Sequence, residues 1–415
     1  MRPPPNPPTY PAPVSPLSEA IQHARRAPFY ASPDWQAAFA LPSPRLEDLP
    51  RITKEQLRRY SPDGFLPPGL DLETLAARGL IEEEATSGTS GASVRVVFGR
   101  EWWAQQERRA LVRNPFLAEL LGDRPSLRRA VLTTPGCSGV SCYQRWLNLE
   151  QRTLGDSLFV NQSRIPFSLG AEKLAGMARE VADWGPTFLD VDPVHGAWFA
   201  PHCERAGLRF PTLRFILTSY EYTSVVHRAI MTRVFGVPVI DLYGSSETGH
   251  LLVEVGEAMR PDPAAALLEI AASADAGPGE LLVTTLTNPY LPLLRYEIGD
   301  YVESRAEGLV VHGRRRDALT DAAGRPVTTR MVDQAFVGIR GVAHYQLRQA
   351  GPGSAHLSLL PEVPGDPLES AREALGAALS RRLGQPVTAH AVDMIAPEDS
   401  GKYRLTVPAE PLPAT

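Results

Sequence analysis

The chain has 415 residues, of which 43% are hydrophobic and 21% charged, with a formal net charge of −5. A globular protein of this length has room for two or three domains of roughly 100–200 residues each. The mildly acidic balance gives no electrostatic reason to expect nucleic acid or an anionic membrane as a partner. Cys137, Cys142 and Cys203 form no CxxC pair and fit a reducing compartment. With no signal-peptide pattern and no run of about 20 apolar residues, we expect a cytoplasmic protein.

Residues 1–16 are dense in proline, which predicts an extended arm without regular helix. Residues 17–57 predict helical segments with polar breaks. From residue 94 onward, short β-branched runs alternate with helical patterns, which favours a layered α/β body with largely parallel strands. The expected strands are 94–98, 130–134, 213–218 and 237–242, and the expected helices are 102–121 and 171–184.

Beyond Gly279 the pattern changes to strand, turn and strand, which predicts a small β-rich subdomain. A charged break at 313–317 follows, and the residues after it have strand and helix patterns of their own. These predict a second domain. Its expected strands are 343–349, 356–360 and 387–392, with a helix at 368–383.

The segment Thr86–Gly91 joins hydroxyl side chains to two glycines and is followed by an expected strand. Glycine lets backbone amides turn inward and hydroxyls add donors, so such a loop can wrap a polyphosphate. The lysine and spacing of a Walker P-loop are missing. Taken alone, a Ser/Thr/Gly turn is more often an ordinary turn.

The stretch 237–249 predicts a buried strand that ends in a glycine turn with Glu247 at its tip. In open α/β sheets, ligands bind outside the carboxyl ends of the strands. Alone, this pattern more often places a solvated glutamate. The preceding expected strand, 213–218, leads to Tyr220 and Glu221.

Three further strings carry charges suited to a nucleotide. Asp300 ends the run Arg295–Asp300 after a glycine, and its two carboxylate oxygens can accept two hydroxyl groups. The run Gly313–Asp317 contains Arg314, although three arginines in a row also suit a solvated linker. Near the carboxyl end, Lys402 follows Ser-Gly, and a mobile ammonium can neutralise charge that develops in a transition state.

These six strings, in this order and at these separations, resemble the adenylate-forming enzymes, and the flanking sequence resembles the phenylacetate–CoA ligase-like branch. The resemblance extends from about residue 17 to 405. It implies an α/β fold with a large layered N-terminal domain, a β-rich subdomain and a small mobile α+β C-terminal domain. The implied division is an arm at 1–16, an AMP-binding domain at 17–313, a hinge at 314–317 and a mobile domain at 318–415.

The resemblance also implies roles for single residues. Lys402, Glu247 and Ser246 would be catalytic, with Mg²⁺ held by Glu247, and Asp317 would be the hinge. Tyr220, Glu221 and Cys137 would lie at the acyl substrate. The nucleotide would be bound by Thr86, Ser87, Gly88, Thr89, Ser90, Gly91, Tyr243, Gly244, Ser245, Asp300 and Arg314.

The sequence departs from the family pattern at several of these positions. Tyr220 replaces a glycine, so its ring is either a wall that selects the substrate or a packing side chain. Ser246 stands where threonine is usual, and Arg316 replaces the first of two acids before the hinge. The scattered histidines and cysteines lack ligand spacing, so we expect no zinc. Because Tyr143 takes the last position of a GxSxG pattern, we expect no catalytic triad.

The implied reaction joins a carboxylic acid, aromatic or arylacetic, to AMP from ATP and then transfers the acyl group to a thiol, most simply CoA. Differences between 133 and 168, at Tyr220 and at 322–330 leave open a second reading. In that reading an enzyme of secondary metabolism passes the acyl group to a carrier protein or an amine. A third reading is a nucleotide or acyl-adenylate binder without turnover. Relatives often pair as dimers, which leaves a homodimer open.

Overall fold

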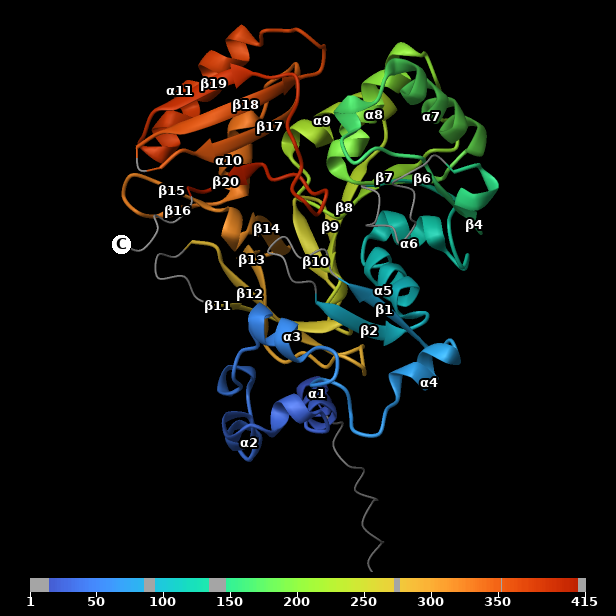
Figure 1. Cartoon of the computed structure of the whole chain (residues 1–415), viewed down its shortest axis with the longest axis vertical. Coiled ribbons are helices and arrows are strands. Elements are labelled where there is room, and N and C mark those ends of the chain that lie inside the picture. Colours follow the sequence, from blue (N-terminus) through green and yellow to red (C-terminus); the bar gives the residue numbers. More distant parts are fainter. Residues whose placement is uncertain (1–14, 86–93, 134–146, 272–276, 352, 410–415) are drawn as a thin grey trace, which may run out of the picture.

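The computed structural model describes residues 15–85, 94–133, 147–271, 277–351 and 353–409. A parallel sheet with helices on both faces lies at its centre (Figure 1). Two of its strands are buried at every residue, as expected for parallel strands that are covered on both faces. The parallel strands are β3 (Arg129–Leu132), β5 (Ser157–Phe159), β6 (Phe188–Val191), β7 (Phe215–Thr218) and β8 (Val239–Ser245). The short β4 (Thr153–Leu154) pairs antiparallel with β5 at the edge.

Helices cover both faces of these strands with separate apolar clusters. On one face lie α7 (Ala171–Trp184), α8 (Pro193–Arg205) and α9 (Val225–Phe235), and on the other α5 (Trp102–Leu111) and α6 (Pro115–Leu121). The sequence predicts a single helix over 102–121, but the chain breaks it at Asn114. The side chain of Asn114 accepts from the backbone of Leu117 and starts a new helix before Pro115.

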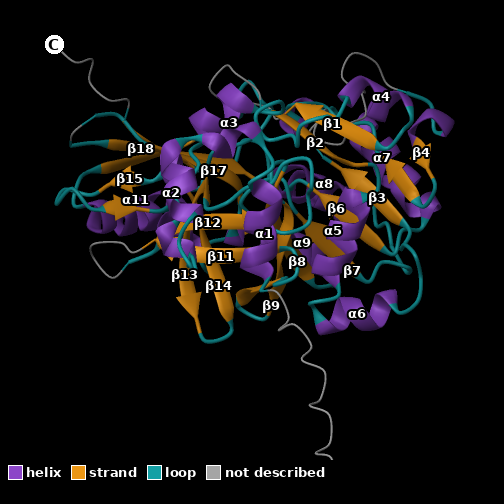
Figure 2. Cartoon of the chain, turned by 90° about the horizontal axis from the view of Figure 1, so that it is seen from below, coloured by secondary structure: helices purple, strands orange, loops and turns teal. Residues whose placement is uncertain are grey.

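Beyond β8 the sheet continues with antiparallel strands. These are β9 (Gly249–Val255), β10 (Ala258–Pro261), β11 (Ala266–Ala271), β12 (Gly279–Thr285), β13 (Tyr296–Arg305) and β14 (Gly308–Arg314). The complete order is β11-β12-β13-β14-β10-β9-β8-β7-β6-β3-β5-β4, a twelve-stranded mixed sheet. Figure 2 shows β11 to β14 toward one side of the molecule and β3, β4 and β6 toward the other. The expected β-rich subdomain is thus an extension of the central sheet.

The N-terminal segment packs on this antiparallel part through its own aromatic cluster. A single bridge between Ile52 and Tyr296 attaches the segment to the beginning of β13, and this places the following helix beside the sheet. The segment contains α1 (Pro16–Ala24), α2 (Pro33–Phe39), α3 (Lys54–Tyr60) and α4 (Leu72–Ala77), then a hairpin of β1 (Ile81–Ala85) and β2 (Arg95–Gly99). Single 3-10 turns lie at Pro28–Ala31, Leu46–Asp48, Glu150–Arg152, Pro166–Ser168, Arg315–Asp317 and Gln334–Phe336.

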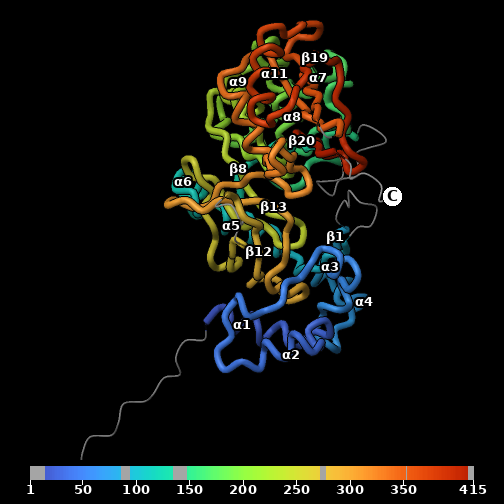
Figure 3. The backbone as a smooth tube through the Cα atoms, turned by 90° about the vertical axis from the view of Figure 1, so that its left-hand side faces the viewer, coloured from blue at the N-terminus to red at the C-terminus, as the bar shows by residue number. Residues whose placement is uncertain are grey.

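A smaller C-terminal domain has a four-stranded sheet in the order β19-β18-β17-β20, with one helix packed against it. The expected strands and helix of this region agree with the structure to within one or two residues. Figure 3 shows this domain against α8 and α9 at one end of the molecule, with the N-terminal helices at the other. Its elements are α10 (Thr329–Asp333), β17 (Val342–Gln349), β18 (Ala355–Pro361), α11 (Glu369–Leu383), β19 (Val387–Ala391) and β20 (Thr406–Val407), after a hairpin of β15 (Leu319–Thr320) and β16 (Pro326–Val327).

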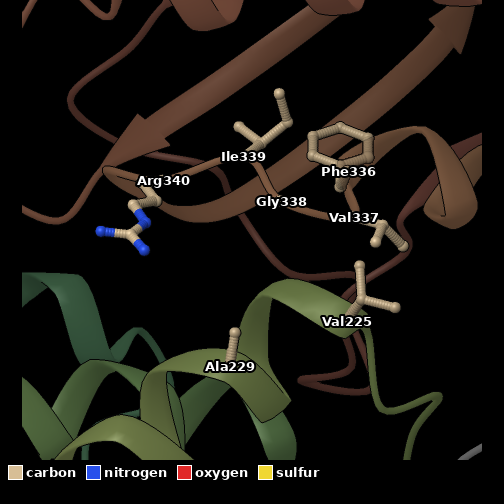
Figure 4. A pocket seen from close by; sticks show the side chains of 7 residues that line it. All are labelled: Val225, Ala229, Phe336, Val337, Gly338, Ile339 and Arg340. Atoms are coloured by element: carbon tan, nitrogen blue, oxygen red, sulfur yellow. The ribbon is translucent and has the colours of Figure 1, made fainter.

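Apolar residues of both domains share one buried cluster, which joins α8 and α9 to β17, β18 and α11. Beside it a groove of about 320 Å³ runs between the domains. Figure 4 shows Val225 and Ala229 of α9 facing the segment Phe336–Arg340 across this groove. Among the helices that the structure describes, none has the length and apolar character to cross a membrane.

Candidate functional site

Two glycines shape the turn that joins β8 to β9. Gly249 has a φ of +70°, and a Cβ on Gly244 would lie 2.1 Å from the carbonyl oxygen of Gly249. Neither position therefore accepts a side chain without movement of the backbone. The turn carries Ser246 and Glu247 just past the carboxyl end of β8, and Ser245 bonds to Thr248 within it at 3.0 Å.

Glu247 is 3% exposed but has a charged partner. Lys54 Nζ, from the beginning of α3, lies 3.3 Å from its Oε1, and Tyr296 Oη donates to the same oxygen at 3.5 Å. Burial alone would raise the pKa of Glu247, but Lys54 and the hydrogen bonds outweigh burial and hold the pKa below its usual value. Glu247 is therefore a carboxylate at neutral pH.

A second acid, Glu84 of β1, lies beside the same turn. Ser246 Oγ donates to Glu84 Oε1 at 3.2 Å. Burial raises the pKa of Glu84, and the charge of Glu247 raises it further, while Ser246 and Lys402 lower it. The ammonium group of Lys402 is therefore close enough for its charge to act on Glu84.

The third acid, Asp300, lies on β13 directly opposite Arg314 of β14. Tyr243 Oη donates to Asp300 Oδ2 at 2.7 Å, which fixes the carboxylate and leaves Oδ1 for another donor. Burial disfavours the charge of Arg314, but Asp300, Asp317 and Glu247 outweigh it and raise the pKa of this guanidinium. Glu221 acts in the same direction, so four acidic side chains favour the charged form of Arg314.

Lys402 reaches the large domain from the C-terminal domain. Its Nζ donates to the carbonyl oxygen of Tyr220 at 3.2 Å, and the next residue, Tyr403, donates its N–H to Glu221 Oε1 at 2.6 Å. Tyr220 has a φ of +73°, a conformation that favours glycine. Burial, and then the charge of Asp192, raise the pKa of Glu221 well above its usual value.

The loop that carries Lys402 is held from two further directions. Arg164, in the large domain, donates to the carbonyl oxygens of Glu398 at 2.7 Å and of Asp399. From the other side, Arg404 Nε lies 2.7 Å from Asp317 Oδ1, the residue predicted as the hinge. The hinge segment and the Lys402 loop are therefore tied together in this arrangement.

The ring of Tyr220 extends toward a partly buried polar cluster. Arg129 Nη1 lies 3.0 Å from Glu107 and 3.3 Å from Asp190. Burial raises the pKa of Asp190 to about 6, although Arg129 and a hydrogen bond from Tyr220 oppose the rise. Burial also lowers the pKa of His250 to about 4, with Glu107 and Arg129 as the charges acting on it. The partly buried side chain of Tyr220 is thus held at this cluster.

The structure gathers most of the predicted residues in one region. Lys402 contacts Tyr220 and the adjoining Tyr403 contacts Glu221 across the two domains, and Glu247 and Asp300 both act on Arg314. Other predicted residues lie outside the described residues. These are Thr86, Ser87, Gly88, Thr89, Ser90 and Gly91 of the glycine-rich loop, and Cys137.

Two residues at the site, Lys54 and Glu84, are absent from the sequence prediction. Lys54 lies in the segment expected to be helical with polar breaks, and the bridge from Ile52 to Tyr296 helps to bring it to Glu247. One feature of the sequence could have singled out Lys54. Only three of the 42 basic residues (Lys plus Arg) are lysines, so each lysine stands out. For Glu84, which follows two other glutamates in an exposed hairpin, we find no such signal.

No protein-family model and no curated protein sequence matches this chain. Solved structures do match it. A 2-hydroxyisobutyryl-CoA ligase in the postadenylation state, in complex with 2-HIB-AMP, is 17% identical with a TM-score of 0.65, covering 92% of this chain and 88% of that chain. The same ligase in the thioesterification state gives a TM-score of 0.53 at 18% identity, over 95% and 89%. An anthranilate CoA ligase in complex with anthranoyl-AMP gives 0.56 at 15% identity, over 78% and 64%.

These likenesses confirm the predicted fold class. The chain has the fold of the adenylate-forming enzymes, with a large mixed α/β body and a smaller C-terminal domain.

Proposed function

We propose that this protein is an AMP-forming acid–thiol ligase. It uses ATP to convert a carboxylic acid to an acyl-AMP and then transfers the acyl group to a thiol, which we infer is CoA. One observation carries this proposal. An ammonium group from the C-terminal domain reaches a region where Glu84, Glu247, Asp300 and Arg314 gather at the carboxyl end of β8.

The nucleotide would be held by the groups that surround Arg314. Asp300 has an oxygen free to accept a ribose hydroxyl because Tyr243 occupies the other one. The ring of Tyr243 would then lie at the base. The guanidinium of Arg314, kept charged by its carboxylates, suits the ribose or a phosphate. This division of roles follows the family resemblance residue by residue.

The acids near Ser246 fit a magnesium ion. Glu247 is ionised and Glu84 lies on the other side of the Ser246 hydroxyl, and oxygen ligands of this type are those that Mg²⁺ prefers. When bound, Mg²⁺ neutralises phosphate charge. Lys402 would do the same at the α-phosphate as pyrophosphate leaves, and its contact with the carbonyl of Tyr220 supports this role.

We propose an aromatic or arylacetic acid as the substrate. The position of Tyr220, between the contact to Lys402 and the Arg129–Asp190 cluster, supports this ring as one wall of the acyl pocket. A likeness to a ligase with anthranoyl-AMP bound agrees with an aromatic acid, at the level of the fold. The polar cluster behind Tyr220 suits an acid whose ring has a polar substituent.

We further propose that the C-terminal domain, residues 318–415, rotates about the 314–317 hinge between the two half-reactions. The higher TM-score to the postadenylation state than to the thioesterification state of one ligase supports an adenylation-type arrangement here. The contact between Arg404 and the hinge residue Asp317 would belong to this arrangement.

The test is acid-dependent exchange between ATP and pyrophosphate, with a panel of benzoic, arylacetic and amino acids. Exchange with at least one acid, lost in Lys402→Ala and retained in Lys173→Ala, supports adenylation, since Lys173 is exposed on α7. Product analysis with CoA, a carrier protein or an amine then identifies the acceptor. ATP binding without exchange for any acid would contradict the proposal and favour a nucleotide binder.

A further inference from the structure

Two histidines form a hydrogen bond between the domains. His227 Nε2, on α9, lies 3.0 Å from His344 Nδ1, on β17 of the C-terminal domain. The ring planes are nearly parallel, at 14°, and their centroids are 5.2 Å apart, so the hydrogen bond joins the two rings edge to edge. Both residues are 0% exposed. We call them the histidine pair.

The pair adjoins the segment that carries Lys402. The ring of Tyr403, the next residue, lies 5.2 Å from that of His344 in an edge-on contact. Phe167 lies 5.9 Å from His344 and covers it from the large domain. A shift of β17 away from α9 would therefore move Tyr403, and Lys402 with it.

Burial keeps both rings neutral. It lowers the pKa of His227 to about 4, against the opposing charge of Asp192 at the beginning of α8. Burial, and then the neighbouring His227, lower the pKa of His344 well below its usual value. An N–H to N hydrogen bond between imidazoles needs one donor and one acceptor, which two neutral rings supply and two protonated rings cannot. A singly protonated pair can still form it, so burial of the charge is what disfavours the first proton in the closed arrangement.

Other titratable groups surround the pair. From α8, Asp192 is ion-paired with His195 at 3.3 Å, and Tyr403 faces the pair from the C-terminal segment. Glu221 and Asp333, also at the domain interface, have pKa values raised by burial, Asp333 to about 6. These two acids change the pH dependence of closure in the direction opposite to the histidines. Because the closed arrangement raises their pKa values, their protonation at low pH favours closure.

We propose that the histidine pair is a latch that holds the C-terminal domain in the arrangement that brings Lys402 into the site. His227 and His344 are then positioning residues for acyl-AMP formation and are not needed for thioester formation. The inference rests on the proposed function. It also uses the finding that one ligase of this fold has been solved in postadenylation, open and thioesterification states.

The direction of the pH effect follows from linkage. Exposed histidine has a pKa of about 6.5, so above that pH neither arrangement binds a proton and the latch is intact. Between about 6.5 and 4, the open arrangement takes up protons that the closed one excludes, and closure weakens as the pH falls. Acyl-AMP formation should therefore lose rate on the acid side before thioester formation does.

The test compares the two half-reactions from pH 5 to 8.5 in the wild type, in His344→Asn and in the double variant His227→Phe, His344→Phe. At pH 8 we expect His344→Asn to lower ATP–pyrophosphate exchange about five- to tenfold, the range of one net hydrogen bond. CoA-dependent consumption of supplied acyl-AMP should be unchanged. The double variant keeps an aromatic contact between α9 and β17 but has no group that can be protonated, so its exchange should lose less rate than the wild type between pH 7 and 5.

Arg233→Gln is the matched control, because Arg233 forms a surface ion pair with Glu362 across the same interface. It should not alter the acid limb. Two results would overturn the latch. One is an equal loss of rate in both half-reactions, and the other is the same decrease in exchange rate between pH 7 and 5 in the wild type and the double variant. If the variants fail to fold, the wild type alone still tests the latch. As the pH is lowered past 6.5, the rate of acyl-AMP formation divided by the rate of thioester formation must decrease.

Small-angle X-ray scattering gives a readout without turnover. The wild type should expand between pH 8 and 5.5, and the double variant should expand less. Absence of exchange at every pH contradicts the proposed function, whereas the scattering comparison still decides the latch.

Discussion

The ammonium group of Lys402 and the main-chain carbonyl of Tyr220 lie 3.2 Å apart, although 182 residues separate them. The contact joins the C-terminal domain to a backbone position whose φ is +73°. A left-handed residue turns its carbonyl in a direction that an ordinary loop would not, which presents the oxygen to Lys402. The backbone conformation of Tyr220 therefore helps to determine where the ammonium group of Lys402 lies.

Tyr220→Gly and Tyr220→Ala separate the backbone of this residue from its ring. Both remove the ring, but only glycine adopts the positive φ freely. The glycine variant should be more stable than the alanine variant by about 1 kcal/mol in chemical denaturation. If the ring is a wall of the acyl pocket, both variants should gain exchange with bulkier acids. Equal stability of the two variants would argue against strain here.

Arg164→Gln should slow acyl-AMP formation without unfolding the protein. The guanidinium donates to two carbonyls of the Lys402 loop and is itself exposed. We expect the kcat of ATP–pyrophosphate exchange to fall about tenfold, while the free energy of unfolding changes by less than about 0.5 kcal/mol. Arg179→Gln, on the exposed face of α7, is the matched control. A kcat equal to that of the control would contradict this role.

Asp241→Asn should stabilise the protein at alkaline pH. Burial, and then the charge of Glu254, raise the pKa of Asp241 from its ordinary value of 3.8 to about 7. Between these values the folded state holds a proton that the unfolded state releases, so stability falls as the pH rises. The amide removes this penalty and can still accept from Thr218 and Thr223.

We expect the gain from Asp241→Asn to reach about 4 kcal/mol at pH 8 and to disappear near pH 4. Thermal unfolding across this range measures it. A gain that is independent of pH would mean that the carboxyl group is not the cause.

Glu247→Gln should act on both metal dependence and stability. With the carboxylate gone, we expect the Mg²⁺ concentration that half-saturates exchange to rise about tenfold or more, as for the loss of a ligand. Because the pKa of Glu247 is lowered on folding, its contribution to stability is present above about pH 4.3 and is lost as the pH falls further.

Urea unfolding of Glu247→Gln should therefore show its largest deficit at neutral pH and a shrinking one toward pH 4. Glu297→Gln, a partly exposed acid on β13, serves as a control for a generic loss of charge. An unchanged magnesium requirement would remove Glu247 from the metal site.

Local pattern was enough for much of this fold. Alternation of strands and helices predicts the layered body, and α7 and the elements of the C-terminal domain lie close to their expected bounds. The motifs also gave Glu221 and Lys402, whose segments the structure places in contact. The predicted domain bounds and residue roles remain predictions.

The features that the sequence analysis missed depend on individual side-chain contacts, most of them between distant segments. The side chain of Asn114 caps a new helix and so interrupts the single expected helix. Hydrophobic periodicity does not predict such a cap. The histidine pair joins residues 117 positions apart, and nothing near either histidine marks a partner. Lys54 is placed by one strand bridge, so its role depends on tertiary packing.

The bridge between Ile52 and Tyr296 has a consequence for where the working unit of this protein begins. The helices before it would be taken for an accessory cap, removable without loss. Yet the only cation within 4.0 Å of Glu247 among the described residues, Lys54, follows the bridge directly. A chain shortened past this lysine would leave a buried carboxylate without its counter-charge, at a cost of several kcal/mol. The pKa of Glu247 would then rise and favour the neutral form. Cleavage near the amino terminus would therefore inactivate a site whose motifs all lie later in the chain.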